Sequence, residues 1–403
     1  MKTTINYGKE RIEVEAENIV TASPRDVRAR DQQAVLNYSL DHPVDSEPLS
    51  FFIEDDFLIV VNDAQRPTPT PVVLDVLLER VSHDNFEVAV ATGSHAPPTK
   101  DDFVYIFGDH YQHLKEKIHV HKAKDTPHTY YGTTKGVDVY LDSILDGFQK
   151  IVVIGSVEPH YFAGFTGGRK AFLPGLAAYT TIEQNHKFAM EKGARNLALK
   201  GNPVHESMEE AAKLVNKDIF SISTVPDTHR RIYTCSSGNL FTSFYETVKS
   251  SKEVYCVPTD IYGIVLAAAP YPMDNSLYQA QKAIESGKLA LRDGGILILV
   301  AQCWNGIGPD MFYQLLKTCK TPDDALKTLK KEYRLGYHKA GKIVELTSRA
   351  QIWAVTDLEP HILKEVFMKP YTSVQKAVDD AVALKGGRVL VLPEASMTVP
   401  LCK

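Results

Sequence analysis

The sequence contains no apolar run that approaches the roughly 20 residues a membrane-spanning helix requires. Its N-terminal stretch, MKTTINYGKERIEVE, has no apolar segment of the kind that marks a secretory signal peptide. Cysteine is scarce, and the five cysteines include no CxxC pair and no paired spacing. An odd number without a disulfide framework is typical of reduced thiols. We therefore expect a soluble, cytoplasmic protein with no membrane partner.

An excess of positive charge is also absent. The formal net charge is −5, and the densest basic runs, 115–124 and 327–334, are interleaved with acids or fall in amphipathic helical patterns. Because a nucleic-acid-binding face needs clustered lysine and arginine, this composition argues against a nucleic-acid partner. The remaining composition, 24% charged and 44% hydrophobic residues, is that of an ordinary globular protein.

Strand and helix patterns alternate along the chain. Apolar, β-branched runs at 57–61, 86–91 and 151–154 predict buried strands in the first part. From residue 270 onward, strands at 296–300, 351–355 and 388–392 alternate with five helical patterns. A chain of 403 residues exceeds what one core usually supports. The pattern predicts an α/β fold of two domains with mostly parallel sheets. The first domain is predicted over 1–257 and the second over 258–393, and residues 394–403 are a candidate segment to complete the first domain.

The strand at 57–61 leads into a polar, proline-rich loop that holds Asp63 and Arg66, and a helix follows. Proline is well tolerated at a first helical turn, and the unpaired amides of that turn form a site for an anion. A structural aspartate with a surface arginine is the plainer alternative.

The same architecture recurs twice. His95 arrives four residues past the strand at 86–91, and His160 follows the strand at 151–154. Because parallel strands present their carboxyl ends at one edge of a sheet, these side chains are expected to lie together, where such sheets bind ligands. A glycine-rich turn with Lys170 comes next. Thr180 and Glu183 then predict a capping box for a helix that carries His186.

Two further groups of polar residues occur in the sequence. The segment 110–128 holds five histidines, but it has no cysteine or close set of carboxylates, and its lysines would repel a cation. We interpret it as a surface helix and strand. Later in the chain, Tyr278, Gln279 and Lys282 can share one helical face that suits a carboxylate, although an ordinary polar face is as plausible on spacing alone.

The loops exclude several common chemistries. The GGRK turn lacks the GK[ST] of a phosphate-binding Walker loop, GSVEPH is not a G-x-S-x-G elbow, and no G-x-G-x-x-G follows a strand. Two histidines on opposite sides of a substrate would suit proton transfer at two faces, and a lysine in such a turn could bind phosphate or bond to a cofactor. The alternatives are a zinc-type metallohydrolase with His95, His160 and His186 as ligands, and a non-catalytic carrier of a nucleotide-like cofactor.

At these residues the sequence resembles a known family. The segments NDAQRPTP, ATGSH, EPHYFAGFTGGRK, TIEQNH and LYQAQK, in this order between about residues 57 and 310, are similar to signature segments of the nickel-dependent lactate racemase family. The resemblance implies two α/β domains, an N-terminal cofactor-binding and catalytic domain and a C-terminal substrate-closing domain, with the active site in the cleft between them. It also implies nickel and a pyridinium-3-thioamide-5-thiocarboxylic acid mononucleotide, the nickel pincer nucleotide, supplied by cofactor-biosynthesis proteins.

The resemblance assigns roles to individual residues. Lys170 would be the covalent tether of the cofactor, His186 the ligand to nickel, and His95 and His160 the paired acid and base. The other cofactor contacts would be Asp63, Arg66, Thr68 and Tyr278, with the nucleotide phosphate in the loop 66–70.

The substrate implied by the resemblance is a small 2-hydroxy acid. Arg66 and Lys282 would hold its carboxylate, and Gln279 would be a further substrate-binding residue. The implied reaction is racemisation or epimerisation: one histidine takes the hydroxyl proton while hydride moves reversibly to the cofactor, and hydride then returns to the other face. The sequence leaves open which 2-hydroxy acid is used, and it assigns no role to Trp304 or Trp353.

Overall fold

The structure, a computed structural model, describes residues 1–28 and 30–402. The chain divides into two compact units: unit 2 is Asp26–Val254, and unit 1 combines Met1–Arg25 with Tyr255–Lys403. Each unit contains a six-stranded, mostly parallel sheet with helices. The predicted fold class of two α/β domains is therefore confirmed.

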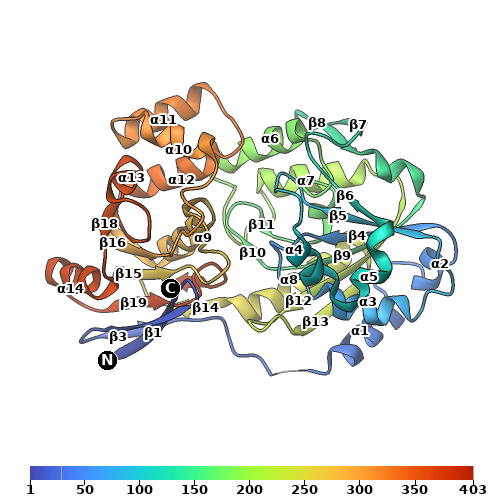
Figure 1. The fold of residues 1–403 in the computed structure, drawn as a ribbon, viewed down its shortest axis with the longest axis horizontal. Helices are drawn as coiled ribbons and strands as arrows, with labels where there is room; N and C mark the ends of the chain where they lie inside the picture. The colour runs from blue at the N-terminus through green and yellow to red at the C-terminus, as the bar shows by residue number, and fades with distance from the viewer. Residues whose placement is uncertain (29, 403) are drawn as a thin grey trace. The chain divides into compact units, whose positions relative to one another are not determined.

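The sheet of unit 2 has the strand order β13-β12-β9-β4-β5-β6 (Figure 1). All neighbours are parallel except β12 and β13. Its strands are β4 (Phe57–Asn62), β5 (Phe86–Ala91), β6 (Ile118–Val120), β9 (Lys150–Ser156), β12 (Asp218–Pro226) and β13 (Ile232–Asn239). From β4 the chain proceeds to β5 and β6 on one side, and from β9 it proceeds to β12 on the other. The strand order thus reverses between β4 and β9, which is where open α/β sheets bind ligands.

Both faces of this sheet are buried. Phe57, Ile59 and Val61 of β4 pack into a core with helices α1, α3 and α4, and the alternate residues Leu58 and Val60 are also buried. Each such side chain contributes roughly 1.5–3 kcal/mol by leaving water. Burial on both faces explains why the strand is a continuous apolar run. The helices of this unit are α1 (Gln32–Asp41), α2 (Leu49–Ile53), α3 (Thr70–Leu78), α4 (Lys100–Phe107), α5 (Tyr111–Leu114), α6 (Tyr179–Lys187), α7 (Pro203–Lys213) and α8 (Leu240–Tyr255).

Helix α6 does not begin with the predicted capping box. The helix begins at Tyr179, with Ala178 at the N-cap position, so Thr180 lies inside its first turn. The hydroxyl of Thr181 instead donates to the carbonyl of Asp138 and accepts from the amide of Tyr140. These two bonds attach α6 to strand β8 (Val137–Asp142), which forms a hairpin with β7 (His128–Thr134). A tertiary contact has replaced the local cap.

The sheet of unit 1 is parallel throughout its described strands, in the order β18-β17-β16-β15-β19-β3. Its strands are β3 (Ile19–Thr21), β15 (Tyr262–Ala268), β16 (Leu291–Val300), β17 (Gln351–Val355), β18 (Lys369–Tyr371) and β19 (Val389–Leu392). The helices are α9 (Leu277–Gly287), α10 (Asp310–Lys317), α11 (Pro322–Lys331), α12 (Tyr337–Thr347), α13 (Pro360–Glu365) and α14 (Val374–Lys385). Trp353 is fully buried on β17 and stacks on Tyr371, so its role is in the core.

The division of the chain differs at both ends from the predicted domains. The first 25 residues belong to unit 1, although the sequence placed them in a domain over 1–257. They do so because β3 pairs with β19, and because Ile5 and Val14 of the hairpin β1 (Lys2–Tyr7) and β2 (Glu10–Glu15) join the core of that unit. The candidate return of 394–403 to the first domain does not occur, since β20 (Val399–Cys402) pairs with β14 (Cys256–Thr259) of unit 1.

Within the described part of the chain, no helix combines the length and the apolar character that crossing a bilayer requires.

Candidate active site

Asp63 and His95 come from neighbouring strands and are hydrogen-bonded to each other. Nδ1 of His95 lies 2.6 Å from Oδ2 of Asp63, whose side chain is 8% exposed. Burial by itself raises the pKa of Asp63, but the charge and hydrogen bond of His95, together with the charge of Arg66, outweigh it and hold the pKa below its usual value. Asp63 is therefore ionised at neutral pH and accepts the Nδ1 proton. This leaves the lone pair of the imidazole on Nε2.

The loop between β4 and α3 is held by its own polar groups. The amide of Arg66 donates to the carbonyl of Asp63, 3.1 Å away. The hydroxyl of Thr68 donates to Oδ1 of Asn62 at 2.8 Å, and it lies 2.7 Å from the hydroxyl of Ser156 at the end of β9. These bonds tie the loops of β4 and β9 together at the point where the strand order reverses. The hydroxyl of Thr68 is thus engaged in shaping the loop.

Phe162 gathers three of the predicted site residues around its ring. The ring centroids of His160 and His186 lie 4.5 and 5.1 Å from that of Phe162, and both pairs are edge-to-face. Nζ of Lys170 lies 5.9 Å from the same ring. Phe162 and Lys170 are almost fully buried. The two histidines and the lysine therefore meet at one hydrophobic side chain, although His160 and His186 are 26 positions apart in the sequence.

A short hairpin positions His160. Strand β10 (Pro159–His160) pairs with β11 (Gly164–Phe165), so that His160 lies opposite Gly164. Gly164 has φ +76°, and a Cβ there would lie 2.1 Å from the carbonyl oxygen of Ala198, so only glycine fits. The amide of Ala163 donates to Nδ1 of His160 at 3.3 Å. With this bond, Nδ1 is the ring atom without a proton, so the neutral form of the imidazole would carry its proton on Nε2.

The loops that carry His95 and Lys170 are in direct contact. The amide of Gly93, two residues before His95, donates to the carbonyl of Gly175 at 2.9 Å. The amide of Gly175 in turn donates to the carbonyl of Lys170 at 3.0 Å. The connections after β4, β5 and β9 are thus linked by hydrogen bonds, as the parallel order predicted.

His186 lies on α6 and has a polar neighbour that orients it. Nδ1 of His186 is 3.2 Å from Oδ1 of Asn185. The buried amide nitrogen of Asn185 donates to the carbonyl of Val204, which turns its oxygen toward the histidine. The sequence singled out the pair of residues but not this role of Asn185, because the partner Val204 lies on another helix.

The other predicted residues are on α9 in unit 1. The carbonyl of Tyr278 accepts a hydrogen bond from Nζ of Lys339, which also lies 3.8 Å from the Tyr278 ring. Nζ of Lys282 is 3.6 Å from the sulfur of Met273. Gln279 is in the first turn of the same helix. The sequence does not indicate this contact of Lys339, because Lys339 and Tyr278 lie on different helices.

The histidine-rich segment is structural, as expected, and its helical part is at the surface with His113 exposed, but His121 is not at the surface. His121 is fully buried, with Nδ1 2.7 Å from Oδ2 of Asp142 and Nε2 3.0 Å from the carbonyl oxygen of Ala177. Nε2 of His119 is 2.9 Å from the same carboxylate oxygen. Burial raises the pKa of Asp142, yet these two imidazoles and a backbone bond outweigh it and lower the pKa well below its usual range. The network anchors the segment that leads into α6.

A zinc site formed by His95, His160 and His186 is not present. Across residues 1–28 and 30–402, no group of three or more histidine, cysteine, aspartate or glutamate side chains is arranged to hold a metal ion. His95 is paired with Asp63, whereas the other two histidines pack on Phe162.

Two protein-family models match the chain. A family model described as the lactate racemase N-terminal domain matches residues 6–197, and one described as the lactate racemase C-terminal domain matches residues 254–399. The chain belongs to the lactate racemase family. The predicted family and, with it, the enzyme class of isomerase are confirmed.

Individual relatives span nearly the whole chain. The lactate racemase of Thermoanaerobacterium thermosaccharolyticum is 27% identical over 90% of this chain and 89% of that protein. The lactate racemase of Lactiplantibacillus plantarum is 28% identical with the same coverage. The apoprotein structure of the first enzyme has a TM-score of 0.91, with 25% identity and full coverage of both chains. A Thermotoga maritima crystal structure, with a TM-score of 0.72 and 14% identity over 94% of this chain and all of that one, shares the fold alone.

Two further residues at the sheet edge of this family member carried no recognisable sequence signal. The guanidinium of Arg230, in the turn after β12, lies 3.7 Å from the ring of Tyr105 on α4. Burial raises the pKa of Tyr105, Arg230 opposes this, and the charges of Glu158 and Asp63 add to it. The charges of Asp63 and Arg230 therefore both act on Tyr105. An arginine in a turn and a tyrosine on a helix have no periodicity that could have indicated this.

Proposed function

We propose that this chain racemises or epimerises a 2-hydroxy acid, lactate or a close relative, with a covalently bound nickel pincer nucleotide as cofactor. Membership in the lactate racemase family supports the reaction class. The observation that carries the proposal is the grouping of His160, Lys170 and His186 around Phe162. An amine and two imidazoles at one buried point are the groups that an anchored metal cofactor and a proton-transfer reaction require.

The donor set of the chain fits the cofactor. Lys170 supplies the amine for the covalent bond, and His186 supplies the imidazole for nickel. Because Nδ1 of His186 faces the amide oxygen of Asn185, the lone pair of the ring is on Nε2, which is the atom a metal needs. One imidazole beside sulfur donors suits square-planar nickel. When bound, the cofactor would supply a carbon centre that accepts a hydride and returns it.

His95 acts as the base in one direction of the reaction. Its Nδ1 proton is held by the ionised Asp63, so Nε2 accepts the hydroxyl proton of the substrate. The nearby carboxylate stabilises the imidazolium that forms. Asp63 therefore acts through His95, in addition to the cofactor contact implied by the resemblance.

His160 complements His95 because its proton is on the other ring atom. Its Nδ1 accepts from the amide of Ala163, so Nε2 is the ring atom that would carry a proton and pass it to the substrate oxygen. One histidine begins as acceptor and the other as donor, and their roles exchange in the reverse direction. A reaction that moves hydrogen between two faces of one carbon needs such a pair.

The anionic groups are assigned to two places. Arg66, in the loop before α3, would bind the substrate carboxylate with its planar guanidinium, and the start of α3, where Thr70 and Val72 carry amides beside prolines, would bind the nucleotide phosphate. Thr68 supports that loop through Asn62 and Ser156. The roles of Tyr278, Gln279 and Lys282 on α9 stay predictions from the resemblance.

The covalent tether gives the most direct test. The protein is loaded with cofactor, and its intact mass and Lys170-containing peptide are measured for the wild type, for Lys170→Arg, and for Lys187→Arg as a matched control on the exposed side of α6. We expect an adduct at Lys170 in the wild type and in the control, and none in Lys170→Arg. An unmodified yet active wild-type enzyme would reject the proposal.

A non-catalytic carrier is distinguished by a second variant. His95→Ala should retain the Lys170 adduct and lose racemase turnover by about 10²-fold or more, the usual contribution of a general base. If turnover per mole of adduct is unchanged, the paired-base mechanism is wrong. If no variant or wild-type protein turns over any 2-hydroxy acid while carrying the adduct, the carrier function is the correct one.

A further inference from the structure

Arg169, the residue before Lys170, is a completely buried cation. Its side chain has no exposed surface and is among the largest fully buried side chains of the chain. Moving a charged group out of water costs several kcal/mol unless its hydrogen bonds are replaced. Its contacts show what replaces them.

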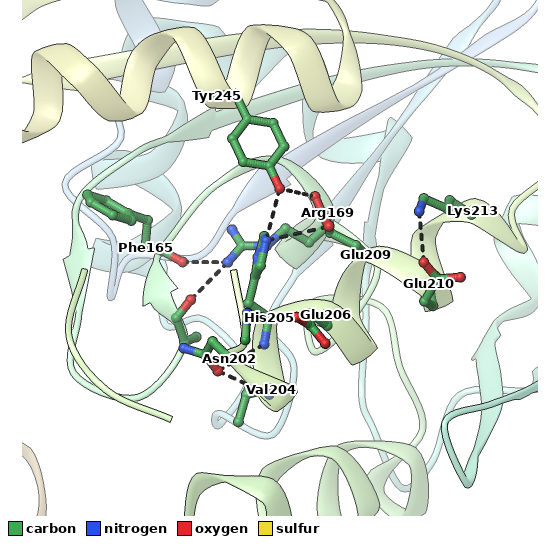
Figure 2. A network of polar contacts seen from close by, with 12 residues as sticks. Phe165, Arg169, Asn202, Val204, His205, Glu206, Glu209, Glu210, Lys213 and Tyr245 are labelled. Atoms are coloured by element: carbon green, nitrogen blue, oxygen red, sulfur yellow. Dashed lines mark hydrogen bonds and ion pairs between the residues drawn. The ribbon is translucent and has the colours of Figure 1, made fainter. Parts of the chain in front are cut away.

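The guanidinium of Arg169 binds four backbone carbonyls of the turn that precedes it. Nη1 donates to the carbonyls of Thr166 and Gly167 at 3.2 and 3.0 Å. Nη2 donates to those of Ala163 and Phe165 at 3.1 and 2.9 Å, and Figure 2 shows the bond to Phe165. Two nitrogens of one planar group thus hold the segment 163–167, which joins His160 to Lys170.

An aromatic ring supports the guanidinium from the side. The ring of Phe244 on α8 lies 4.4 Å from the guanidinium carbon of Arg169. Phe244 also closes the space beside Gly168, where an added Cβ would lie 3.1 Å from the Cβ of Phe244. The turn is therefore enclosed between α8 and its own arginine. Within the described residues, the buried Nε of Arg169 has no hydrogen-bond partner. The guanidinium is therefore oriented so that its two Nη atoms reach the four carbonyls, although this leaves Nε without a hydrogen bond.

The charge of Arg169 is not used in a direct ion pair with a described residue. Glu209 acts on it at longer range, and its carboxylate accepts from the hydroxyl of Tyr245 at 2.7 Å. His205 lies beside them, with Nε2 3.1 Å from the Tyr245 hydroxyl (Figure 2). Burial and the charge of Arg169 lower the pKa of His205 to about 3, so this histidine is neutral. Burial lowers the pKa of Arg169 to about 9, which leaves it charged at neutral pH.

The geometry connects Arg169 to the direction of the next side chain. Arg169 and Lys170 are consecutive in the 3-10 turn Gly168–Ala171. The amide of Lys170 donates to the carbonyl of Gly167, which is one of the four carbonyls that Arg169 holds. Successive residues of such a turn project about 120° apart, so fixing one side chain sets the direction of its neighbour. With Arg169 directed at Phe244, Lys170 is directed at Phe162.

We propose that Arg169 is a positioning residue that aims the amine of Lys170 by clamping the carbonyls of residues 163–167. The inference rests on the proposed function in one respect, namely that the amine of Lys170 attaches the cofactor covalently. The clamp itself concerns only residues of this chain, so it can be tested with and without cofactor.

The test uses Arg169→Lys, with Arg80→Lys as the matched control in a solvent-accessible ion pair with Asp41. Lysine keeps the charge, but a single ammonium cannot reach four carbonyls as a fork does. Acylation of lysine amines by a small anhydride, which releases its carboxylate, is followed at Lys170, with the buried Lys339 of unit 1 as the internal reference. We expect the labelling of Lys170 to rise about fivefold while the labelling of Lys339 is unchanged. Adduct formation during cofactor loading should be about tenfold slower, as expected for one or two lost hydrogen bonds. Turnover per mole of adduct should stay near the wild-type value.

The outcomes separate this proposal from its alternatives. Wild-type labelling and loading in Arg169→Lys would overturn it, as would a parallel rise at Lys170 and Lys339, which indicates a general loss of stability. If Arg169→Lys does not fold, Phe244→Leu is tested instead, because it retains the guanidinium but removes the aromatic ring that supports it. A selective change of labelling at Lys170 in this variant supports the clamp, and the absence of that change overturns the clamp. If the wild type forms no adduct, the tether of the proposed function fails, while the labelling still decides the role of Arg169.

Discussion

Replacement of Asp63 by asparagine tests the pairing at the centre of the proposed mechanism. The carboxylate accepts the Nδ1 proton of His95 over 2.6 Å in a nearly buried position. Asparagine has the same shape but no charge. Its amide oxygen accepts a weaker bond, and its amide nitrogen would place the imidazole proton on Nε2, where the proposed base needs a lone pair. Turnover should therefore fall.

The size of the loss follows from the kind of bond that is removed. A hydrogen bond to a charged group contributes about 1.5–3 kcal/mol, and 1.4 kcal/mol corresponds to a factor of ten. We therefore expect kcat to fall about 10- to 100-fold. The lost support for the imidazolium applies to the transition state more than to substrate binding, so KM should change much less.

Racemisation is measured by chiral analysis of the product and divided by the fraction of protein that carries the Lys170 adduct. Asp75→Asn is the matched control, because Oδ1 of Asp75 lies 2.6 Å from Nε2 of His110 in a comparable pair, with Asp75 49% exposed and outside the site. The control should keep wild-type turnover. If Asp63→Asn remains within about twofold of the wild type at equal adduct content, the assignment of His95 as an oriented base is wrong.

Three further predictions concern other parts of unit 2. Asp142→Asn should lower the free energy of unfolding by about 3–5 kcal/mol at pH 7, because it leaves two imidazoles without their carboxylate. In urea titrations, this difference from the wild type should shrink below about pH 4. A carboxyl whose folded-state pKa is lowered loses its stabilising effect as the pH falls below its unfolded-state pKa. Gly164→Ala should cost about 2 kcal/mol or more in the same assay, owing to its positive φ and the overlap with the carbonyl of Ala198. His186→Ala should retain the Lys170 adduct but lose nickel, which metal analysis beside intact mass would show; retention of stoichiometric nickel would contradict the ligand role.

The local patterns were reliable where one local rule decided the outcome. Strand β5 is found at the residues predicted for it, 86–91, because its apolar residues 88–91 are buried in succession, as in a central parallel strand. The loops with Asp63, His95 and His160 come together because parallel strands end at one edge of the sheet. The motif segments also indicated the lactate racemase family, which the family models confirm.

The errors occurred where a distant partner competed with a local rule. The capping box before α6 failed because Thr181 is bonded to strand β8. The first 25 residues were assigned to the wrong unit because nothing within β3 indicates that it pairs with β19 near the other end of the chain. His121 was interpreted as a surface residue because its carboxylate partner, Asp142, lies on a separate hairpin.

By itself, the sequence determined which residue types stand at the ends of the strands, because periodicity and loop composition are local properties of the chain. It therefore determined the fold class and the family. The tertiary structure alone decided which partner faces Nδ1 of His95 and of His160, and that an arginine without a motif of its own binds the turn beside Lys170. Hydrogen-bond direction and burial depend on the partner that folding brings within about 3 Å, and that partner is not written in the neighbouring residues.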